Sequence, residues 1–141
     1  MQRVGTIKRK TSETDIGVTL TLNNTEQSKI NSGVPFFDHM LYSMSKHGRF
    51  KLELTCIGDL HIDDHHSVED IGICIGQALK SALGDKSGIN RFGNSIIPMD
   101  ESLTMVAIDI CGRSYFKYTG QDLKGFIKSY SEELTLEFLR S

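Results

Sequence analysis

Apolar and polar residues alternate over two segments in the first half of the chain, residues 15–22 and residues 50–57. A period of two places successive side chains on opposite faces of a strand, so both segments are predicted to be strands with one buried face. Residues 3–10 are predicted to pair with the first of them. The segment from Ser32 to Pro35 is predicted to be a loop, and Pro35 suits the first turn of a helix.

Two segments show helical spacing instead. Residues 36–47 place Phe37, Met40, Leu41 and Met44 on one face, and Gly48 is expected to end this helix. The second helix is predicted to begin within residues 63–70, and Gly84 is expected to end it. Its apolar positions are Val68, Ile71, Ile75, Ala78, Leu79 and Ala82.

Gly72 and Gly76 lie one turn apart inside the second helix and are expected to permit close approach of another backbone. Further along, residues 103–110 are predicted to be a buried strand, with residues 113–119 as its hairpin neighbour. A last helix is predicted from about Ser131. The order of these elements predicts an α+β fold, with helices on one face of a largely antiparallel sheet.

Composition narrows the class of protein further. The chain has 141 residues, enough for one domain, and a formal net charge of −2 with both signs interspersed, so no nucleic-acid or membrane partner is expected. The N-terminus lacks the apolar core of a signal peptide, and a cytoplasmic location is expected. Cys56, Cys74 and Cys111 are expected to be buried free thiols in a reducing compartment.

The candidate chemistry centres on residues 63–70, where two adjacent histidines are each followed four residues later by a carboxylate. On a helix this spacing predicts that His65 pairs with Glu69 and His66 with Asp70. Adjacent side chains diverge by about 100°, so the two histidines are expected to serve two metals, or one metal and another partner. Imidazole and carboxylate suit zinc, manganese, iron or nickel. The alternative is a solvated helix cap.

Other polar residues are less informative alone. His39 and His47 share the first helix, where one can reach a site and the other support it; the alternative for His39 is a hydrogen-bonded core residue. Glu13 taken alone is a surface glutamate. Arg91 and Arg113 lie at glycine-flanked turns and can match phosphate oxygens, and the alternative for each is a surface ion pair.

Several motifs occur together and in order over essentially the whole chain. They are residues 11–14, 36–41, 58–66, 68–72, 82–86, 98–101 and 112–113. In these the chain resembles the imidazoleglycerol-phosphate dehydratase family. The resemblance implies tandem α+β sheet-and-helix layers of the ribosomal protein S5 domain 2-like type. Residues 1–88 would be the first repeat and residues 89–141 an incomplete second repeat, together forming one compact domain.

The resemblance also implies a homo-oligomer with active sites between subunits and two Mn²⁺ ions at each site. His39 and His66 would bind one metal, and His65 and Glu69 the other. Glu13 would contact the substrate as an acid/base. The residues implied to bind substrate are Glu13, His39, His47, His65, His66, Glu69, Arg91 and Arg113.

The implied reaction is the dehydration of imidazole glycerol phosphate to imidazole acetol phosphate, in histidine biosynthesis. The metals would act as Lewis acids around the substrate's imidazole ring. Glu13 would shuttle protons, and Arg91 and Arg113 would fix the phosphate.

The chain departs from the family pattern in one respect, because its last histidine is His66. The family has a second His-His-x-x-Glu helix, and each metal draws ligands from both halves. We therefore expect a C-terminally truncated member that is inactive or nearly so alone, and poorly soluble. The alternatives are a metal-binding fragment without turnover and, if the resemblance fails, a metallohydrolase.

Overall fold

The computed structural model describes residues 2–141, which group into two compact units. Unit 1 joins the chain up to Gly84 with Tyr118–Ser141, and unit 2 is Asp85–Lys117. This grouping follows contacts within the chain and differs from the predicted boundary between residues 88 and 89. Whether residues 1–88 and 89–141 are structural repeats stays a prediction.

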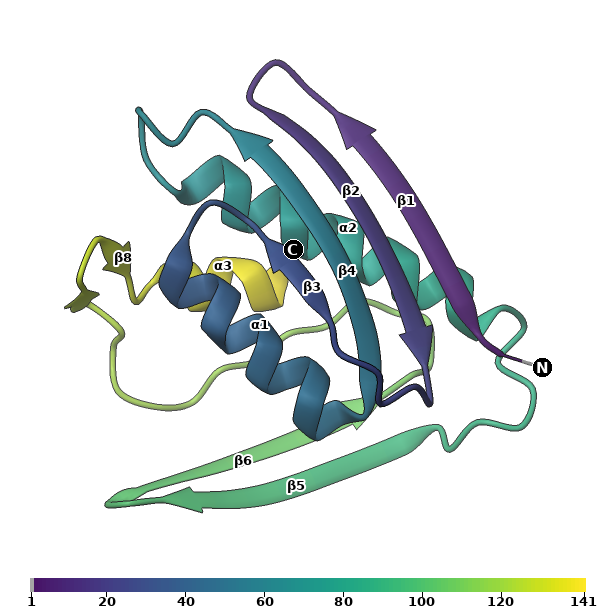
Figure 1. Ribbon diagram of the computed structural model, residues 1–141. Coiled ribbons are helices and arrows are strands. Elements are labelled where there is room, and N and C mark those ends of the chain that lie inside the picture. Colours follow the sequence, from purple (N-terminus) through teal and green to yellow (C-terminus); the bar gives the residue numbers. More distant parts are fainter. Residues whose placement is uncertain (1) are drawn as a thin grey trace. The chain divides into compact units, whose positions relative to one another are not determined.

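Unit 1 contains a four-stranded sheet with the strand order β1-β2-β4-β3 (Figure 1). Its strands are β1 (Val4–Lys10), β2 (Thr14–Leu22), β3 (Lys29–Asn31) and β4 (Phe50–Gly58). The pairs β1–β2 and β2–β4 are antiparallel, and only the short β3 runs parallel to its neighbour β4. The predicted strands and the predicted pairing of residues 3–10 are confirmed, whereas β3 was too short to show a pattern.

The alternation along β2 and β4 buries one face of the sheet. Across the register, residues of β2 face residues of β4 in buried apolar pairs, which are Ile16–Cys56, Val18–Leu54 and Leu20–Leu52. Burial of such pairs is the main favourable contribution to the free energy of folding. The core of unit 1 therefore begins on this face.

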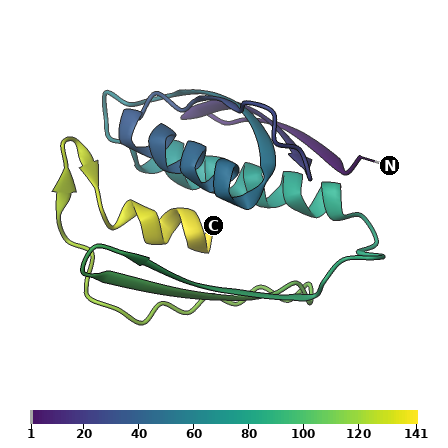
Figure 2. The ribbon, with the colours of Figure 1, turned by 60° about the horizontal axis from the view of Figure 1, so that its bottom comes forward.

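Helices cover the buried face. They are α1 (Pro35–Gly48), α2 (His65–Leu83) and α3 (Leu134–Arg140). α1 and α2 lie against the same face of the sheet, and α3 packs on α2 (Figures 1 and 2). Their buried residues complete one core with the strands. The predicted α+β class, with helices on one face of a largely antiparallel sheet, is confirmed.

The helix ends differ from the prediction in detail. Gly48 is still helical, and Arg49 adopts the left-handed conformation at φ 55° while its N–H donates to the Ser45 carbonyl. Gly84 ends α2 at a positive φ, as expected. The last helix begins at Leu134, not near Ser131, because Tyr130–Ser131 forms β8, which pairs with β7 (Phe126–Ile127).

The two glycines of α2 behave differently. A Cβ at Gly72 would lie 2.8 Å from the carbonyl oxygen of Phe138, so this glycine permits the close approach of α3. Within the described part of the chain, no atom outside the helix lies within 4 Å of a Cβ built at Gly76. The predicted close approach is therefore confirmed at Gly72 and wrong at Gly76.

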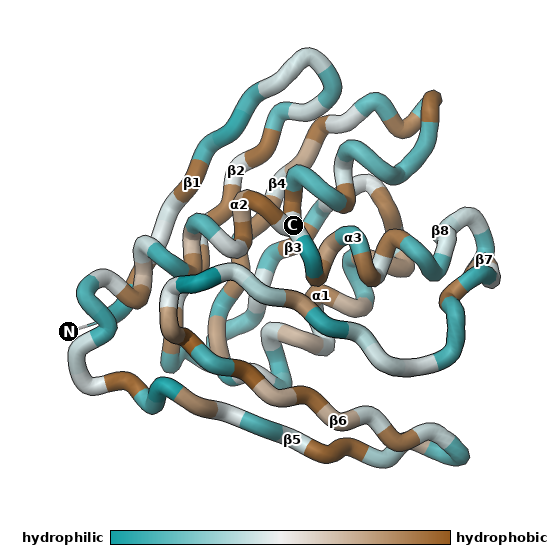
Figure 3. Tube along the Cα trace, turned by 180° about the vertical axis from the view of Figure 1, so that it is seen from behind, coloured by the Kyte–Doolittle hydropathy of each residue, from teal (hydrophilic) through white to brown (hydrophobic). Residues whose placement is uncertain are grey.

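Unit 2 contains the hairpin of β5 (Phe92–Met99) and β6 (Ser102–Asp109). The predicted strand at 103–110 exists, but it is exposed and not buried, and its partner is β5 and not residues 113–119. Asp100 adopts φ 49°, which allows a tight turn between β5 and β6. β6 therefore pairs with the strand that precedes it. Apolar segments recur along both strands (Figure 3).

The cysteines are all free thiols: Cys56 and Cys74 are buried, as expected, whereas Cys111 is only half-buried. No helix in residues 2–141 is both long and apolar enough to cross a membrane.

Candidate functional site

The predicted histidine–carboxylate segment forms the first turns of α2. The Asp63 carboxylate accepts the backbone N–H of His65 at 2.8 Å and so satisfies one free donor at the helix start. Burial, followed by the charge of Asp63, raises the pKa of Asp64. The segment follows β4 and so lies at the end of the sheet where β4 ends (Figure 1). β2 begins at the same end, because its Thr14 is paired with Gly58 of β4.

His65 and Glu69 form the predicted pair. His65 Nε2 lies 3.7 Å from Glu69 Oε2, and about two-fifths of each side chain is exposed, at 43% and 44%. That distance is too long for a direct hydrogen bond. An imidazole nitrogen and a carboxylate oxygen thus face the same region from one side of the helix. Both remain free to bind a third group, such as a metal ion.

His66 does not pair with Asp70, contrary to prediction. Its Nδ1 lies 2.9 Å from Oδ2 of Asp59, in the loop that follows β4, and this hydrogen bond is the main cause of its raised pKa. A proton shared between Nδ1 and the carboxylate leaves Nε2 as the free ring nitrogen. His65 and His66 thus face different carboxylates, Glu69 and Asp59, and in this sense the predicted divergence is confirmed. Their ring centroids lie 6.1 Å apart.

Asp70 points toward the strands instead. Its Oδ1 accepts hydrogen bonds from Arg9 Nε at 3.1 Å and Nη2 at 2.8 Å, and its Oδ2 accepts the Thr14 hydroxyl at 2.5 Å. The residue is 7% exposed. A buried carboxylate requires such partners, and those of Asp70 come from β1 and β2.

Glu13 lies in the turn between β1 and β2, and its side chain is exposed. The hydroxyl of Ser12 donates to its carboxylate at 2.7 Å, and this bond is the main cause of its lowered pKa, to which the charge of His66 also contributes. Its backbone carbonyl accepts the N–H of Asp59 at 3.1 Å. The structure therefore connects the Glu13 turn directly to the residue that holds His66.

The histidines of α1 are not joined to this group. His39 and His47 are both exposed, so the alternative of a core histidine at position 39 is wrong. Among residues 2–141, no three His, Cys, Asp or Glu side chains lie close enough together to hold a metal ion. The assignment of His39 to a metal and of His47 to the substrate stays a prediction.

The two arginines belong to unit 2. Arg91 donates to both oxygens of Asp109, at 2.7 and 3.1 Å, and its guanidinium lies 4.9 Å from the Phe92 ring centroid. This is the surface ion pair that was the alternative to phosphate binding. Arg113 is exposed. Their role toward a phosphate stays a prediction.

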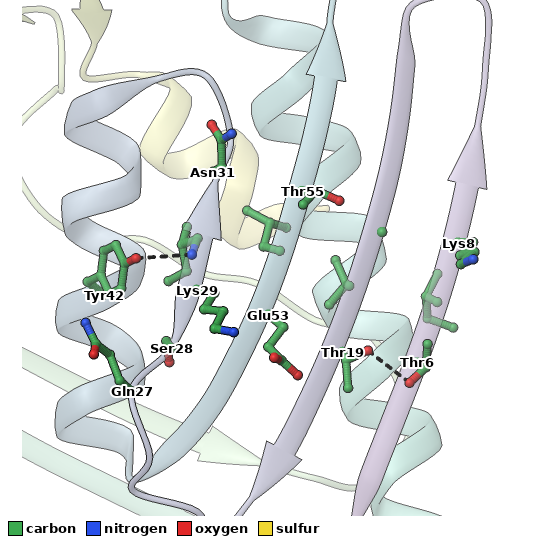
Figure 4. Close-up of a pocket in the computed structure, with 15 residues that line it drawn as sticks. Thr6, Lys8, Thr19, Gln27, Ser28, Lys29, Asn31, Tyr42, Glu53 and Thr55 are labelled. Atoms are coloured by element: carbon green, nitrogen blue, oxygen red, sulfur yellow. Dashed lines mark hydrogen bonds between the residues drawn. The ribbon is translucent and has the colours of Figure 1, made fainter.

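Two hollows of unit 1 bear on the site. One of about 350 Å³ lies beside His65 and is also lined by Asp63, Asp64 and Glu133. A larger one, of about 640 Å³, lies on the solvent-facing side of the sheet, where its lining includes Thr6, Thr19 and Thr55 (Figure 4). Neither His65 nor His66 lines the larger hollow, and we place the candidate site by its chemistry, at the start of α2.

Asp59 and Thr14 are the site residues that sequence reasoning missed. Asp59 precedes His66 by seven residues across a loop, and Thr14 is separated from Asp70 by 56 residues. No periodicity connects such positions, although both residues lie inside the motifs that carry the resemblance. The loop after β4 brings Asp59 to His66, and the packing of α2 on β1 and β2 brings Thr14 to Asp70.

Fold and site together define an α+β protein that presents paired imidazole and carboxylate donors at one end of its sheet, beside an exposed glutamate. The model of the family described as imidazoleglycerol-phosphate dehydratase matches residues 32–141. The chain belongs to this family, whose members are hydro-lyases.

Individual relatives agree. The imidazoleglycerol-phosphate dehydratase of Pelotomaculum thermopropionicum is 50% identical over 140 residues, which cover 99% of this chain and 72% of the relative. That of Geobacillus thermodenitrificans is 47% identical, with 99% and 71% covered. The crystal structure of the Staphylococcus aureus enzyme superposes with a TM-score of 0.85 at 35% identity, covering 97% of this chain and 75% of that one. For the Pyrococcus furiosus protein in complex with (S)-C348 the TM-score is 0.78 at 33% identity, with 94% and 70% covered.

Proposed function

We propose that the chain dehydrates imidazole glycerol phosphate to imidazole acetol phosphate, a step of histidine biosynthesis, in the cytoplasm. Membership of the dehydratase family supports the reaction class. The observation that carries the site assignment is the link from Glu13 through Asp59 to His66, which places a carboxylate turn beside an oriented imidazole. A dehydration needs such a group to move a proton near the reacting carbons.

The donor set fits a divalent transition metal, and Mn²⁺ is the ion we propose. His65 and Glu69 would hold one ion, and His66 with His39 the other. The fit rests on His66, because Asp59 fixes Nδ1 and leaves Nε2 as the ligand atom, the arrangement by which proteins orient metal-binding histidines. Bound Mn²⁺ would supply Lewis-acid stabilisation of negative charge on the substrate's imidazole ring.

Glu13 is the proposed acid/base. Its side chain is a carboxylate at neutral pH and can accept the carbon-bound proton, although the hydrogen bond from Ser12 lowers its pKa and so weakens it as a base. Its exposure leaves it accessible to a substrate. His47 would contact the substrate, and Arg91 and Arg113 would hold its phosphate. Arg91 would then give up its ion pair with Asp109 and bind the phosphate instead.

A homo-oligomer would complete the site. Within the part of the chain that the structure describes, each proposed metal has only a partial set of ligands, and His39 lies exposed on another helix. A second copy can supply further donors, since two protein ligands per ion fill only part of the octahedral shell that Mn²⁺ prefers.

The test of the proposed function is the reaction itself. If a homo-oligomer completes the site, the purified chain with Mn²⁺ and imidazole glycerol phosphate should form imidazole acetol phosphate, contrary to the expectation that the chain alone is inactive. Chromatography and mass spectrometry measure the product. Release of inorganic phosphate instead would indicate a metallohydrolase. Formation of neither product by a folded, Mn²⁺-loaded protein would refute the dehydratase proposal for this chain.

The first prediction concerns the metal ligand. His66→Ala should lower Mn²⁺ content and dehydration together, each by at least about tenfold, because even a change in a residue that only orients such a ligand costs 10–100-fold in affinity. His61→Ala is the matched control, since His61 is exposed and outside the proposed ligands. Elemental analysis after gel filtration checks the metal. Unchanged metal and rate in His66→Ala would contradict the assignment.

A second candidate function is metal binding without turnover. It is favoured by the same incomplete ligand sets, since no three donors meet among residues 2–141. Mn²⁺ binding that depends on His66, together with the absence of product at any protein concentration, would select this candidate.

A further inference from the structure

We propose that Asp70 and Thr14 act as positioning residues that fix the Glu13 turn against the His66 side of α2. The inference rests on the proposed function, because it assumes that Glu13 handles the proton. It assigns a task to Asp70, which lies next to the proposed ligand Glu69 but faces away from the other donors.

The turn that carries Glu13 is held by one threonine. Thr11 Oγ1 accepts the backbone N–H groups of Glu13 and Thr14, at 3.1 and 3.0 Å. The Thr11 N–H also donates to the Thr14 carbonyl at 2.8 Å. Side-chain acceptors of this kind set the backbone of short turns. The direction of the Glu13 side chain therefore depends on where the Thr11 hydroxyl is fixed.

Thr14 fixes that hydroxyl. Its own Oγ1 lies 3.2 Å from Thr11 Oγ1 and donates to Asp70 Oδ2 at 2.5 Å. Because the Thr14 proton is committed to the carboxylate, its oxygen is left to accept from Thr11. The result is a chain of hydrogen bonds from the turn to α2, in which each bond strengthens the next.

The other oxygen of Asp70 holds the opposite stem of the same hairpin. Arg9, on β1, donates two hydrogen bonds to Oδ1. A single carboxylate thus holds both strands that flank the Glu13 turn. Thr14 is 3% exposed and Asp70 7% exposed, so water does not compete strongly for these bonds.

The contacts close into a ring that includes the proposed site. From Asp70 the ring runs through Thr14 to the Glu13 turn, whose carbonyl accepts the N–H of Asp59 at 3.1 Å, and Asp59 holds His66 Nδ1 at 2.9 Å. His66 and Asp70 lie one turn apart on α2. Two consecutive turns of α2 therefore hold the segment that bears Glu13, His66 through Asp59 and Asp70 through Thr14.

The test compares Thr14→Val, which keeps the shape of the side chain but removes the hydroxyl, with Thr14→Ser, which keeps the hydroxyl. Val18→Ala is the control for general loss of stability, since Val18 is buried on the same strand and has no part in the ring. The readouts are amide hydrogen exchange across the full chain and, separately, kcat and KM for the dehydration.

Thr14→Val should accelerate exchange at the amides of Glu13, Thr14 and Asp59 by at least tenfold while the amides in the middle of β4 keep their protection. It should lower kcat with little change in KM, and Thr14→Ser should restore both readouts. Unchanged exchange at the turn would overturn the proposal. Faster exchange spread evenly through β4, as expected of Val18→Ala, would overturn it as well.

Glu13→Gln separates this inference from the proposed function. Full turnover in Glu13→Gln would refute the proton role of Glu13, and with it the proposed function of the site. Loss of turnover in Glu13→Gln combined with full turnover in Thr14→Val would refute only the positioning role.

Discussion

At the residue scale, the buried thiol of Cys74 shows how the interior of unit 1 acts on a single group. Cys74 lies on α2 with no exposed surface, and burial raises the pKa of its thiol to about 11, although the charge of Arg9 lowers it. Removal of a thiolate from water is unfavourable, so the folded chain retains the proton at pH values where the unfolded chain has lost it.

We therefore predict that Cys74 makes the fold sensitive to alkali. Because the folded pKa lies above the unfolded one, the contribution is fully present below about pH 9, the ordinary pKa of the group, and falls as the pH rises through 11. The full loss should be on the order of 3 kcal/mol in the free energy of unfolding. Urea unfolding at a series of pH values measures it.

Cys74→Ala should flatten that pH dependence, whatever its cost at neutral pH. Cys111→Ala, at a half-buried position, should leave the slope unchanged. Since lysines and tyrosines titrate equally in all three proteins, the difference in slope isolates Cys74. Equal slopes in wild type and Cys74→Ala would contradict the prediction.

Partners of individual residues were predictable only where the helix itself sets them. Spacing gave the pair His65–Glu69 and the divergence of His65 from His66. It failed for Asp70, because a guanidinium on β1 offers charge-assisted hydrogen bonds that a histidine on the same helix cannot match. The position of β1 over α2 is a property of the tertiary fold, which no local pattern contains.

At the scale of elements, the packing of α3 on α2 depends on the missing side chain at Gly72. A Cβ there would meet the Phe138 carbonyl oxygen at 2.8 Å and Cδ2 of the same residue at 3.3 Å, as well as the Ser141 hydroxyl. Contacts below 3 Å with backbone cannot be relieved by a rotamer change. α3 would have to move away from the core that it helps to cover.

Gly72→Ala should therefore lower the free energy of unfolding by about 1–3 kcal/mol, the usual cost of overpacking. Gly76→Ala on the same helix is the control and should raise it by about 0.5–1 kcal/mol, since alanine loses less backbone entropy and no described atom obstructs its Cβ. Urea unfolding monitored by circular dichroism measures both. Equal effects of the two substitutions would show that α3 does not constrain Gly72.

Elements were predictable where one face is buried and the segment is long. β2, β4, α1 and α2 all show their period in the sequence. β5 was missed because Gly93, Asn94 and Pro98 interrupt its pattern, and β6 was therefore given the wrong partner. An exposed hairpin has no buried face to impose an alternation, so its pairing is set by the tight turn at Asp100.

At the scale of the whole molecule, the hairpin of unit 2 carries a dense group of exposed large apolar side chains. Its two-stranded sheet has no further strand on either edge within residues 2–141. Large apolar side chains along it are more than half exposed, among them Phe92, Ile96, Ile97, Met99, Leu103, Met105 and Ile108. An isolated hairpin is only marginally stable, and unpaired edges with apolar faces favour association between chains.

We therefore predict that the purified chain associates through this hairpin as its concentration rises. The net charge of −2 provides little repulsion to oppose this. The double substitution Ile96→Lys and Met105→Glu should raise the concentration at which association begins by about tenfold, because it removes one apolar cross-strand pair and replaces it with opposite charges that support the same register. Light scattering after gel filtration over a concentration series measures the effect.

The matched control places the same charges at the neighbouring pair Asn94–Ala107, as Asn94→Lys with Ala107→Glu, and should shift the onset much less, because it removes no large apolar side chain. If both double variants shift the onset equally, added charge and not the apolar surface governs association. A single sharp monomer peak for the wild-type chain at every concentration, with one cooperative melting transition, would contradict the prediction. It would mean that the exposed apolar side chains of the hairpin do not drive association between chains.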